Sequence, residues 1–303
     1  MNIGSVLRWL LGLGLVALIG VYLVVALALV MGATQANRKA AVSLPGDFGL
    51  PYEEVTFPSR EGDVELSGWL IPGAPEQPYV IFVHGLDSER SADGAVDLAS
   101  RLVEQGYNVL LFDLRGHGRS GGERISGGYF EREDVLGAYD FLLSRGAVAG
   151  RVGLLGFSLG GGVAIMAAAD ERGIVAVVAD SAFADIDDLI AQETARKTFL
   201  SEELVPVFLP AARLFADRLY GIDLGDISPE RDAALLTFPV LLIHGDADSR
   251  IPPSHSRRIQ QRAHLGSELW SPADLEHVDA FLAQPDEYAR RVIGYLEARF
   301  ADP

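Results

Sequence analysis

A serine between two glycines is the clearest chemical signal in this chain. A short apolar run from Val152 leads into Gly156-Phe157-Ser158-Leu159-Gly160, which fits the pattern G-x-S-x-G. The following stretch, Gly161–Ala169, is apolar and rich in alanine, as expected for a buried helix. A strand, a sharp turn that carries serine, and a helix are the context in which this pattern presents a nucleophile. We therefore predict that Ser158 is a nucleophilic serine at the carboxyl end of a buried strand.

A nucleophilic serine needs a histidine base and an acid that orients the base. Where this turn occurs, the acid and then the histidine follow the serine along the chain. The apolar run Phe238–Ile243 leads into His244-Gly245-Asp246-Ala247-Asp248. We choose Asp248 as the acid. Asp246, which is nearer the end of the run, and Asp180, which closes another apolar run, are the alternatives.

Three histidines follow the candidate acid: His255, His264 and His277. His255 lies in a predicted helix beside two arginines, so we expect it at the surface. His264 ends that helix and is a candidate for its C-cap. His277 lies in a loop after the last short strand, and such a loop can return a side chain to the carboxyl edge of the sheet. We predict that His277 is the base.

Two backbone N–H groups are expected to stabilise the oxyanion of the reaction. One belongs to Leu159, at the start of the helix after the serine. The other belongs to Leu86, in the loop after the apolar run Tyr79–Val83. His84-Gly85 would position this loop, and we expect the side chain of His84 to be structural.

Short apolar runs alternate along the chain with segments of helical periodicity. The predicted strands are Glu53–Pro58, Val64–Ile71, Tyr79–Val83, Asn108–Phe112, Val152–Leu155, Ile174–Ala179, Phe238–Ile243 and Glu268–Trp270. The predicted helices are Ala95–Glu104, Glu131–Ser144, Gly161–Ala169, Pro252–Ala263 and Pro285–Phe300. This alternation predicts an α/β fold with a mostly parallel sheet covered by helices on both faces. Active sites in such sheets lie at the carboxyl ends of the strands.

The segment Phe183–Leu236 interrupts this alternation because it is longer than a plain crossover. It contains two stretches of helical pattern, Ile186–Lys197 and Leu209–Tyr220. We predict that it forms a helical cap over the site. An ordinary long helical connection is the alternative.

The N-terminal run Trp9–Met31 is apolar and uncharged. At about 1.5 Å per residue, a helix of this length crosses a roughly 30 Å hydrocarbon core. It is also longer than the roughly 7–15 residues of a signal-peptide core, although a signal peptide cleaved near Thr34-Gln35-Ala36 is the alternative. We predict a single-pass cell-membrane anchor over 1–36, a linker over 37–51 and a catalytic domain over 52–303. The flanking charges nearly balance, so the side of the membrane stays open.

Composition excludes several other classes of function. The chain has 303 residues and a net charge of −17, which argues against binding nucleic acid through its phosphates. It has no cysteine, so disulfides and thiol catalysis are excluded. The six histidines follow no metal-binding spacing, so we expect neither a metal nor another cofactor.

From about Tyr52 to Phe300 the chain resembles the α/β-hydrolase superfamily, in particular its membrane-tethered serine hydrolases of the Bem46-like and serine-aminopeptidase-like type. The residues that carry the resemblance are His84-Gly85, Asp113-x-Arg115-Gly116-x-Gly118-x-Ser120, Gly156-Phe157-Ser158-Leu159-Gly160, Asp180-Ser181, His244-Gly245-x-x-Asp248-x-x-Ile251-Pro252, and His277 followed by Phe281, Pro285 and Tyr288. It implies the α/β-hydrolase fold with a cap. It also implies the site residues: the triad Ser158, Asp248 and His277, and the oxyanion donors Leu86 and Leu159. Glu276 departs from the pattern, because many relatives have glycine there, and this affects the shape of the loop.

These observations predict a membrane-anchored serine hydrolase that cleaves a small-molecule or lipid-like carboxylic ester through an acyl-enzyme. A peptidase or amidase would use the same triad, with cap residues such as Glu202 or Glu203 holding the amine of the peptide. An acyltransferase or thioesterase also fits. A non-catalytic binding module is the alternative from a different class, and the intact Ser158, Asp248 and His277 argue against it.

Overall fold

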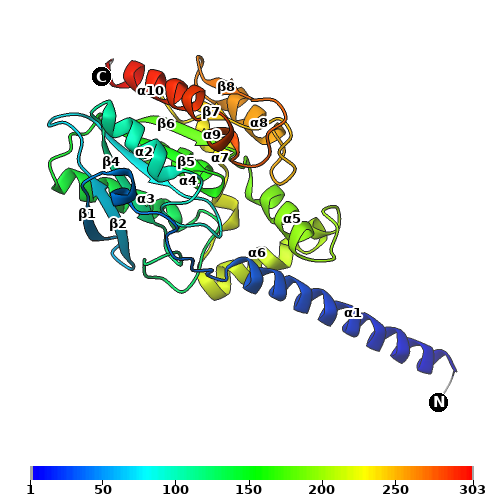
Figure 1. The fold of residues 1–303 in the computed structure, drawn as a ribbon. Coiled ribbons are helices and arrows are strands. Elements are labelled where there is room, and N and C mark those ends of the chain that lie inside the picture. The colour runs from blue at the N-terminus through cyan, green and yellow to red at the C-terminus, as the bar shows by residue number, and fades with distance from the viewer. Residues whose placement is uncertain (1–2, 302–303) are drawn as a thin grey trace.

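The computed structural model describes residues 3–301, which form a mostly parallel eight-stranded sheet between two layers of helices (Figure 1). The strands are β1 (Glu53–Pro58), β2 (Glu65–Ile71), β3 (Tyr79–Val83), β4 (Asn108–Asp113), β5 (Val152–Phe157), β6 (Ile174–Asp180), β7 (Leu241–Ile243) and β8 (Glu268–Trp270). Their order across the sheet is β1-β2-β4-β3-β5-β6-β7-β8. The pairs β1–β2 and β2–β4 are antiparallel, and the remaining pairs are parallel. The predicted fold class is confirmed.

Two helical layers cover the sheet. A long N-terminal helix and a group of cap helices, which lie between β6 and β7 in the chain, complete the fold. The α-helices are α1 (Ile3–Ala33), α2 (Ala95–Glu104), α3 (Glu131–Ser144), α4 (Leu159–Asp170), α5 (Ile186–Lys197), α6 (Leu209–Tyr220), α7 (Pro229–Ala233), α8 (Ser254–Arg262), α9 (Ala280–Ala283) and α10 (Pro285–Ala301). Short 3₁₀ helices occur at η1 (Pro45–Phe48), η2 (Val205–Val207) and η3 (Leu224–Asp226).

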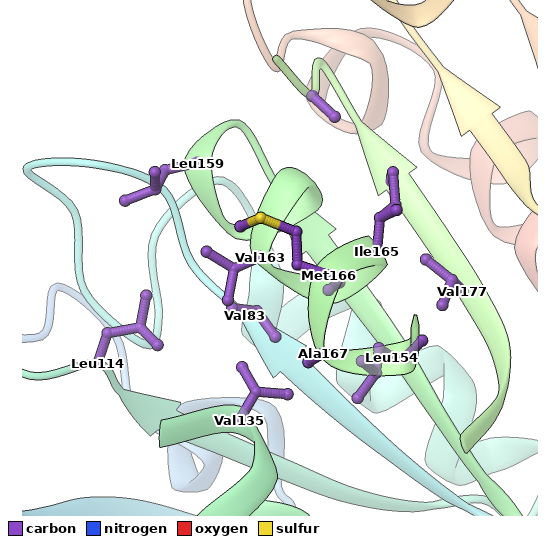
Figure 2. Packing of buried hydrophobic residues seen from close by; sticks show 14 of the residues in the cluster. Val83, Leu114, Val135, Leu154, Leu159, Val163, Ile165, Met166, Ala167 and Val177 are labelled. Carbon is purple, nitrogen blue, oxygen red and sulfur yellow. The ribbon is translucent and has the colours of Figure 1, made fainter. Parts of the chain in front are cut away.

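Alternating side chains of the strands supply two separate apolar cores. In β3, Val80 and Phe82 join the core beneath α2 and α10, whereas Ile81 and Val83 join the core beneath α3 and α4. Successive side chains of a strand point to opposite faces, so a strand that is apolar throughout requires cover on both faces. Figure 2 shows the second core, where Val163 of α4 lies beside Val83 of β3. These two cores hold the central strands in register and thereby fix the carboxyl edge of the sheet.

Strand β7 is shorter than the predicted strand Phe238–Ile243, because it begins only at Leu241. Pro239 explains the difference. Proline has no backbone N–H and cannot donate to a neighbouring strand inside a sheet. The carboxyl end of the strand, where the predicted acid follows, is unaffected.

The N-terminal helix α1 leaves the body beside the cap helices and runs away from it (Figure 1). It is long and apolar enough to cross a membrane. Near its C-terminal end it packs on α6, where Ala26 and Val30 are buried. The ring of Tyr22 stacks on Phe208, with 5.5 Å between the ring centroids. The helix is therefore docked on the cap at one end and exposed over most of its length.

The segment after α1, predicted as a linker, is hydrogen-bonded to the body. The Arg38 guanidinium donates to the carbonyls of Gly118 (3.2 Å) and Gly122 (2.6 Å). At the end of α1, the Thr34 carbonyl accepts a hydrogen bond from the amide of Ile125 (3.1 Å). These contacts fix the end of α1 relative to the sheet.

Candidate active site

Ser158 lies in the tight turn between β5 and α4, in a strained backbone conformation with φ 54° and ψ −118°. Two glycines make the turn possible. A Cβ on Gly156 would lie 2.2 Å from the carbonyl oxygen of Gly160, and a Cβ on Gly160 would lie 2.0 Å from the carbonyl oxygen of Val83. The first glycine therefore clears the start of α4, and the second clears the end of β3. The Ser158 amide donates to the carbonyl of Asp180 (2.8 Å), which ties the turn to the end of the neighbouring strand β6.

The structure brings Ser158, His277 and Asp248 together in one hydrogen-bonded row. His277 Nε2 lies 2.8 Å from Ser158 Oγ, and His277 Nδ1 lies 2.7 Å from Asp248 Oδ2. A carboxylate can only accept, so Nδ1 carries the proton and donates to Asp248. Nε2 is then free to accept the hydroxyl proton of Ser158. This is the order of contacts through which a serine hydroxyl is activated.

Asp248 is buried and held in its ionised form. Its Oδ1 accepts hydrogen bonds from the amides of Arg250 and Ile251, both at 2.9 Å. Its Oδ2 also lies 3.1 Å from Nε2 of His244. Burial acts to raise the pKa of Asp248, but the hydrogen bonds from His244 and His277 outweigh burial and hold this pKa below its usual value. An ionised carboxylate fixes the His277 tautomer and stabilises a positive charge on the ring.

The two alternative acids have other partners. Asp246 is exposed, and its carboxylate accepts from the amide of Asp274 (2.7 Å), which closes the loop before His277. Asp180 is buried and accepts from the hydroxyl of Ser181 (2.9 Å). Within residues 3–301, neither carboxylate is hydrogen-bonded to His277.

The expectation that His255 lies at the surface is wrong. Its ring is buried, with Nδ1 accepting from the amide of Ala184 (3.0 Å) and Nε2 lying 2.9 Å from the side-chain amide of Gln192. Burial lowers the pKa of His255 to about 4. Arg257, two positions along α8, points to solvent, whereas Arg258 pairs with Asp188 of α5 (2.5 Å) and Glu230 of α7 (2.7 Å). His264 lies exposed after the end of α8.

Two backbone amides, those of Leu86 and Leu159, lie close to Ser158. Leu159 provides the first amide of α4, and Leu86 follows Gly85 in the loop after β3. Gly85 lies against Ser158, since a Cβ there would be 3.1 Å from the Cβ of Ser158. In the described part of the chain, neither the Leu86 nor the Leu159 amide has a hydrogen-bond acceptor. Both amides are therefore free to donate to a ligand.

His84 supports this loop, as predicted from the sequence. Its Nε2 accepts from the amide of Leu114 (3.0 Å), and its Nδ1 donates to the carbonyl of Gly85 (2.8 Å). Burial and the neighbouring His117 lower the pKa of His84 to about 3, so its ring is neutral. Both ring nitrogens are used to join the β3 and β4 loops.

Two supports of the His277 loop were not predicted from the sequence. Glu276 accepts hydrogen bonds from the amide (3.0 Å) and the hydroxyl (2.9 Å) of Ser249, which ties the His277 loop to the Asp248 loop. The Ser181 hydroxyl accepts from the amide of Val278 (3.2 Å), whose φ is +62°. A β-branched residue rarely adopts this backbone conformation, so the backbone is strained next to His277. Glycine is not required before His277, because the backbone of Glu276 does not adopt a positive φ.

Two cavities meet beside Ser158. A polar cavity of about 380 Å³ contains Ser158 and His277 and is lined by charged side chains that include Lys39, Asp93 and Arg250. A second, mainly apolar cavity of about 560 Å³ lies between the end of α1, the cap and the loop after β3 that contains Leu86. Asn37, Leu86 and Asp87 line both cavities. Across residues 3–301, no cluster of histidine and carboxylate side chains is arranged to hold a metal ion.

Comparisons with known proteins agree with this fold. Residues 54–204 match the family model of the X-Pro dipeptidyl-peptidases (S15 family). The uncharacterised protein YfhR of Salmonella typhi is 33% identical over 246 residues, which cover 76% of this chain and 75% of YfhR. The human protein ABHD12B is 28% identical over 61% of this chain and 50% of its own length.

Solved structures share the same fold. The esterase Pf2001 of Pyrococcus furiosus superposes with a TM-score of 0.73 at 26% identity, over 88% of this chain and 98% of the esterase. A puromycin-hydrolysing peptidase of Mycobacterium tuberculosis shares the fold, with a TM-score of 0.64 at 18% identity over 83% of this chain and 39% of the peptidase. The chain belongs to the α/β-hydrolase superfamily, together with YfhR. A peptidase family and an esterase occur among these matches, so they identify a hydrolase and leave the type of scissile bond open.

Proposed function

We propose that this hydrolase cleaves carboxylic esters, with Ser158 as nucleophile, His277 as general base and Asp248 as the orienting acid. The observation that carries the proposal is the row of two hydrogen bonds, 2.8 Å from Ser158 to His277 and 2.7 Å from His277 to Asp248. The strained turn at Ser158 and the free amides of Leu86 and Leu159 support it.

In the first half of the reaction, Ser158 Oγ attacks the ester carbonyl while His277 Nε2 takes its proton. The amides of Leu86 and Leu159 donate to the oxygen that becomes negative. Ionised Asp248 stabilises the positive charge on the His277 ring. His277 then returns the proton to the departing alcohol, and the acyl group stays on Ser158.

In the second half, water enters the polar cavity and gives a proton to His277 Nε2 as its oxygen attacks the acyl carbonyl. The same two amides stabilise the second oxyanion. Ser158 leaves with the proton from His277, and the carboxylic acid is released. Side chains and amides of this chain, together with water, supply every group that both halves of the reaction need. The proposed mechanism therefore includes no cofactor.

The proposed location is a membrane, with α1 as an uncleaved single-pass anchor. The length and apolar surface of α1 support this assignment, but a cleaved signal sequence has the same character near an N-terminus. The expected result is a chain of full mass that stays in the membrane fraction after an alkaline carbonate wash. A shorter chain that begins near Ala36 and is released by the wash would contradict the anchor.

A peptidase is the second candidate, because the S15 family model covers the turn at Ser158 and much of the sheet. Glu202 and Glu203, expected to hold the amine of a peptide, are exposed and line neither cavity near Ser158. Asp93 lines the polar cavity instead and is a better placed partner for an amine.

The test compares esters with amides on the full-length protein in detergent. We expect turnover of p-nitrophenyl butyrate that is lost in Ser158→Ala and retained in Ser144→Ala, an exposed serine of α3. Ester turnover that persists in pure Ser158→Ala protein would contradict the mechanism. Faster turnover of aminoacyl p-nitroanilides than of the butyrate would favour the peptidase.

A further inference from the structure

We propose that the apolar cavity between α1 and the cap holds the acyl chain of a membrane-borne ester, so that the anchor helix forms one wall of the acyl-binding site. This inference rests on the proposed function, since it assigns the acyl side of the ester that Ser158 attacks. The substrate class is an amphiphilic ester with one acyl chain and a polar alcohol.

The composition of the cavity suits an acyl chain. Its volume of about 560 Å³ lies within the usual range for small-molecule sites. Leu29 of α1 lines one wall, and Ile186, Leu189 and Ile190 of α5 line the opposite wall. Each charged member of the lining has an ion-pair partner, because Lys197 pairs with Asp87 (2.9 Å) and Arg250 pairs with Glu193 (2.7 Å). An aliphatic chain would therefore displace no unpaired charge.

The cavity begins at the oxyanion residues. Leu86 and Leu159 line it, and their backbone amides are the oxyanion donors of the proposed mechanism. Leu86 also lines the polar cavity, which contains Ser158 and His277. An ester with its carbonyl at Ser158 would extend its acyl chain past these two leucines toward α1. Its alcohol would lie in the polar cavity, where Lys39 and Arg250 supply donors.

The position of the cavity along α1 places it at the membrane surface. A hydrocarbon core of roughly 30 Å takes about 20 residues of helix. Counted from Trp9, the first residue after Arg8, the core ends near Ala28. The α1 residues that line the cavity, Ala28, Leu29, Gly32 and Ala33, begin at this boundary. A chain from the adjacent leaflet can therefore enter along α1 without crossing water.

The surface of the cap beside α1 supports the same placement. Phe199 is 98% exposed, and Leu204 and Val207 are also exposed on the cap segment before α6. The stack of Tyr22 on Phe208 brings the start of α6 against the membrane-spanning part of α1. Large apolar side chains at a protein surface mark a contact with membrane or protein, and here the neighbouring surface is the bilayer that α1 enters. The cap thus rests on the leaflet that supplies the acyl chain.

The experiment uses the full-length protein in lipid nanodiscs and measures kcat/KM for p-nitrophenyl dodecanoate and p-nitrophenyl butyrate. Leu29→Trp and Ile190→Trp fill the cavity from opposite walls. We expect each variant to lower the ratio of dodecanoate to butyrate kcat/KM by at least about ten-fold, because several methylenes lose their buried position. Met31→Trp adds the same side chain to α1 at an exposed position outside the lining and should keep the ratio within about two-fold.

The outcomes separate this inference from the proposed function. A ratio that stays unchanged in both cavity-filling variants, while butyrate is hydrolysed and Ser158 reacts with a fluorophosphonate, would overturn the acyl site and leave the esterase mechanism standing. A wild-type protein that neither hydrolyses an ester nor reacts with the fluorophosphonate would overturn the mechanism and the acyl site with it. Labelling rates of the two tryptophan variants equal to that of the wild type show that the turn at Ser158 is intact.

Discussion

The site has two halves that are held by different kinds of contact. Around Ser158 the backbone decides the geometry: Gly156 and Gly160 permit close approaches, and the Asp248 carboxylate accepts two backbone amides. Around the apolar cavity, side chains of α1 and α5 form much of the wall, and Tyr22 on Phe208 is an aromatic contact between α1 and the cap.

This difference implies different tolerance to substitution. Hydrogen bonds and backbone contacts around a nucleophile fail when one atom moves by about an ångström. Apolar packing between helices accepts changes of shape at a modest loss of stability. We therefore expect substitutions in the catalytic half to abolish turnover or folding, and substitutions in the cap and anchor half to change substrate preference and local mobility.

The largest expected effect is that of His277→Ala. Removal of the base should lower kcat for p-nitrophenyl butyrate by about 10⁴-fold or more, because Ser158 then has no proton acceptor. Steady-state kinetics measure the effect, and His264→Ala, the exposed histidine after α8, is the matched control. A loss of less than ten-fold in a folded His277→Ala protein would mean that another group acts as the base.

Gly160→Ala tests the backbone contact that supports the nucleophile. The added Cβ would lie 2.0 Å from the Val83 carbonyl oxygen, so strand β3 or helix α4 must shift. We expect a loss of about 3 kcal/mol or more in stability, seen as a fall of about 10 °C in the melting temperature. Gly294→Ala in α10 is the control, since nothing lies within 4 Å of its added Cβ. An equal melting temperature for both variants would contradict the steric role of Gly160.

Asp180→Asn tests a buried carboxyl beneath the His277 loop. Burial raises the pKa of Asp180 to about 6, above its usual value of 3.8. The folded state therefore binds the proton more tightly than the unfolded state, and Asp180 lowers stability as pH rises from about 4 to 6. Asparagine stays neutral, so Asp180→Asn should melt about 5–10 °C higher than the wild type at pH 8 and at the same temperature near pH 4. A lower melting temperature for the variant at pH 8 would contradict this sign.

Tyr22→Ala tests the contact between α1 and the cap. An aromatic pair contributes about 0.5–1.5 kcal/mol beyond its buried area. We expect amide hydrogens of α6 to exchange several-fold faster in this variant, as measured by mass spectrometry in nanodiscs. Val21→Ala, one position away on an exposed side of α1, should leave the exchange of α6 unchanged. Equal exchange in both variants would mean that the stack does not hold the cap.

Glu276→Ala should give the smallest effect on the catalytic half. It removes both hydrogen bonds to Ser249, and hydrogen bonds of this kind contribute about 1 kcal/mol each. Since the loops remain joined by His277 and Asp248, we expect kcat for p-nitrophenyl butyrate to fall about two- to ten-fold. Glu268→Ala, at an exposed glutamate of β8, is the control. An unchanged kcat in Glu276→Ala would show that the link does not position the base.

Much of the fold was predictable from local patterns, because each central strand is a short apolar run bounded by turn residues. The bounds of β3, α2, α3, α5 and α6 coincide with the predicted ranges. The shortened β7 shows the limit of this reasoning, since an apolar run was given more weight than Pro239 within it.

The candidate site was predictable where the residue types and their order along the chain identify the residues. It was less predictable where packing between distant segments determines which side chains are buried. Ser158, Asp248 and His277 stand in the expected order, and the structure brings them together. His255 was misplaced because a charged neighbour does not show which face of a helix is exposed: Arg257 faces solvent, whereas Arg258 forms ion pairs with α5 and α7. No local sequence pattern predicts that α1 lines the cavity, because a long apolar helix has the same sequence character whether or not it packs on the protein.

The most direct test of the central claim is covalent labelling of the full-length protein with a fluorophosphonate, followed by peptide mass spectrometry. The account predicts one adduct per chain on the peptide that contains Ser158, and no adduct in Ser158→Ala. It also predicts labelling that is slower by orders of magnitude in His277→Ala, because the hydroxyl then keeps its proton. An adduct on another residue, or labelling of Ser158 at an undiminished rate without His277, would contradict the account.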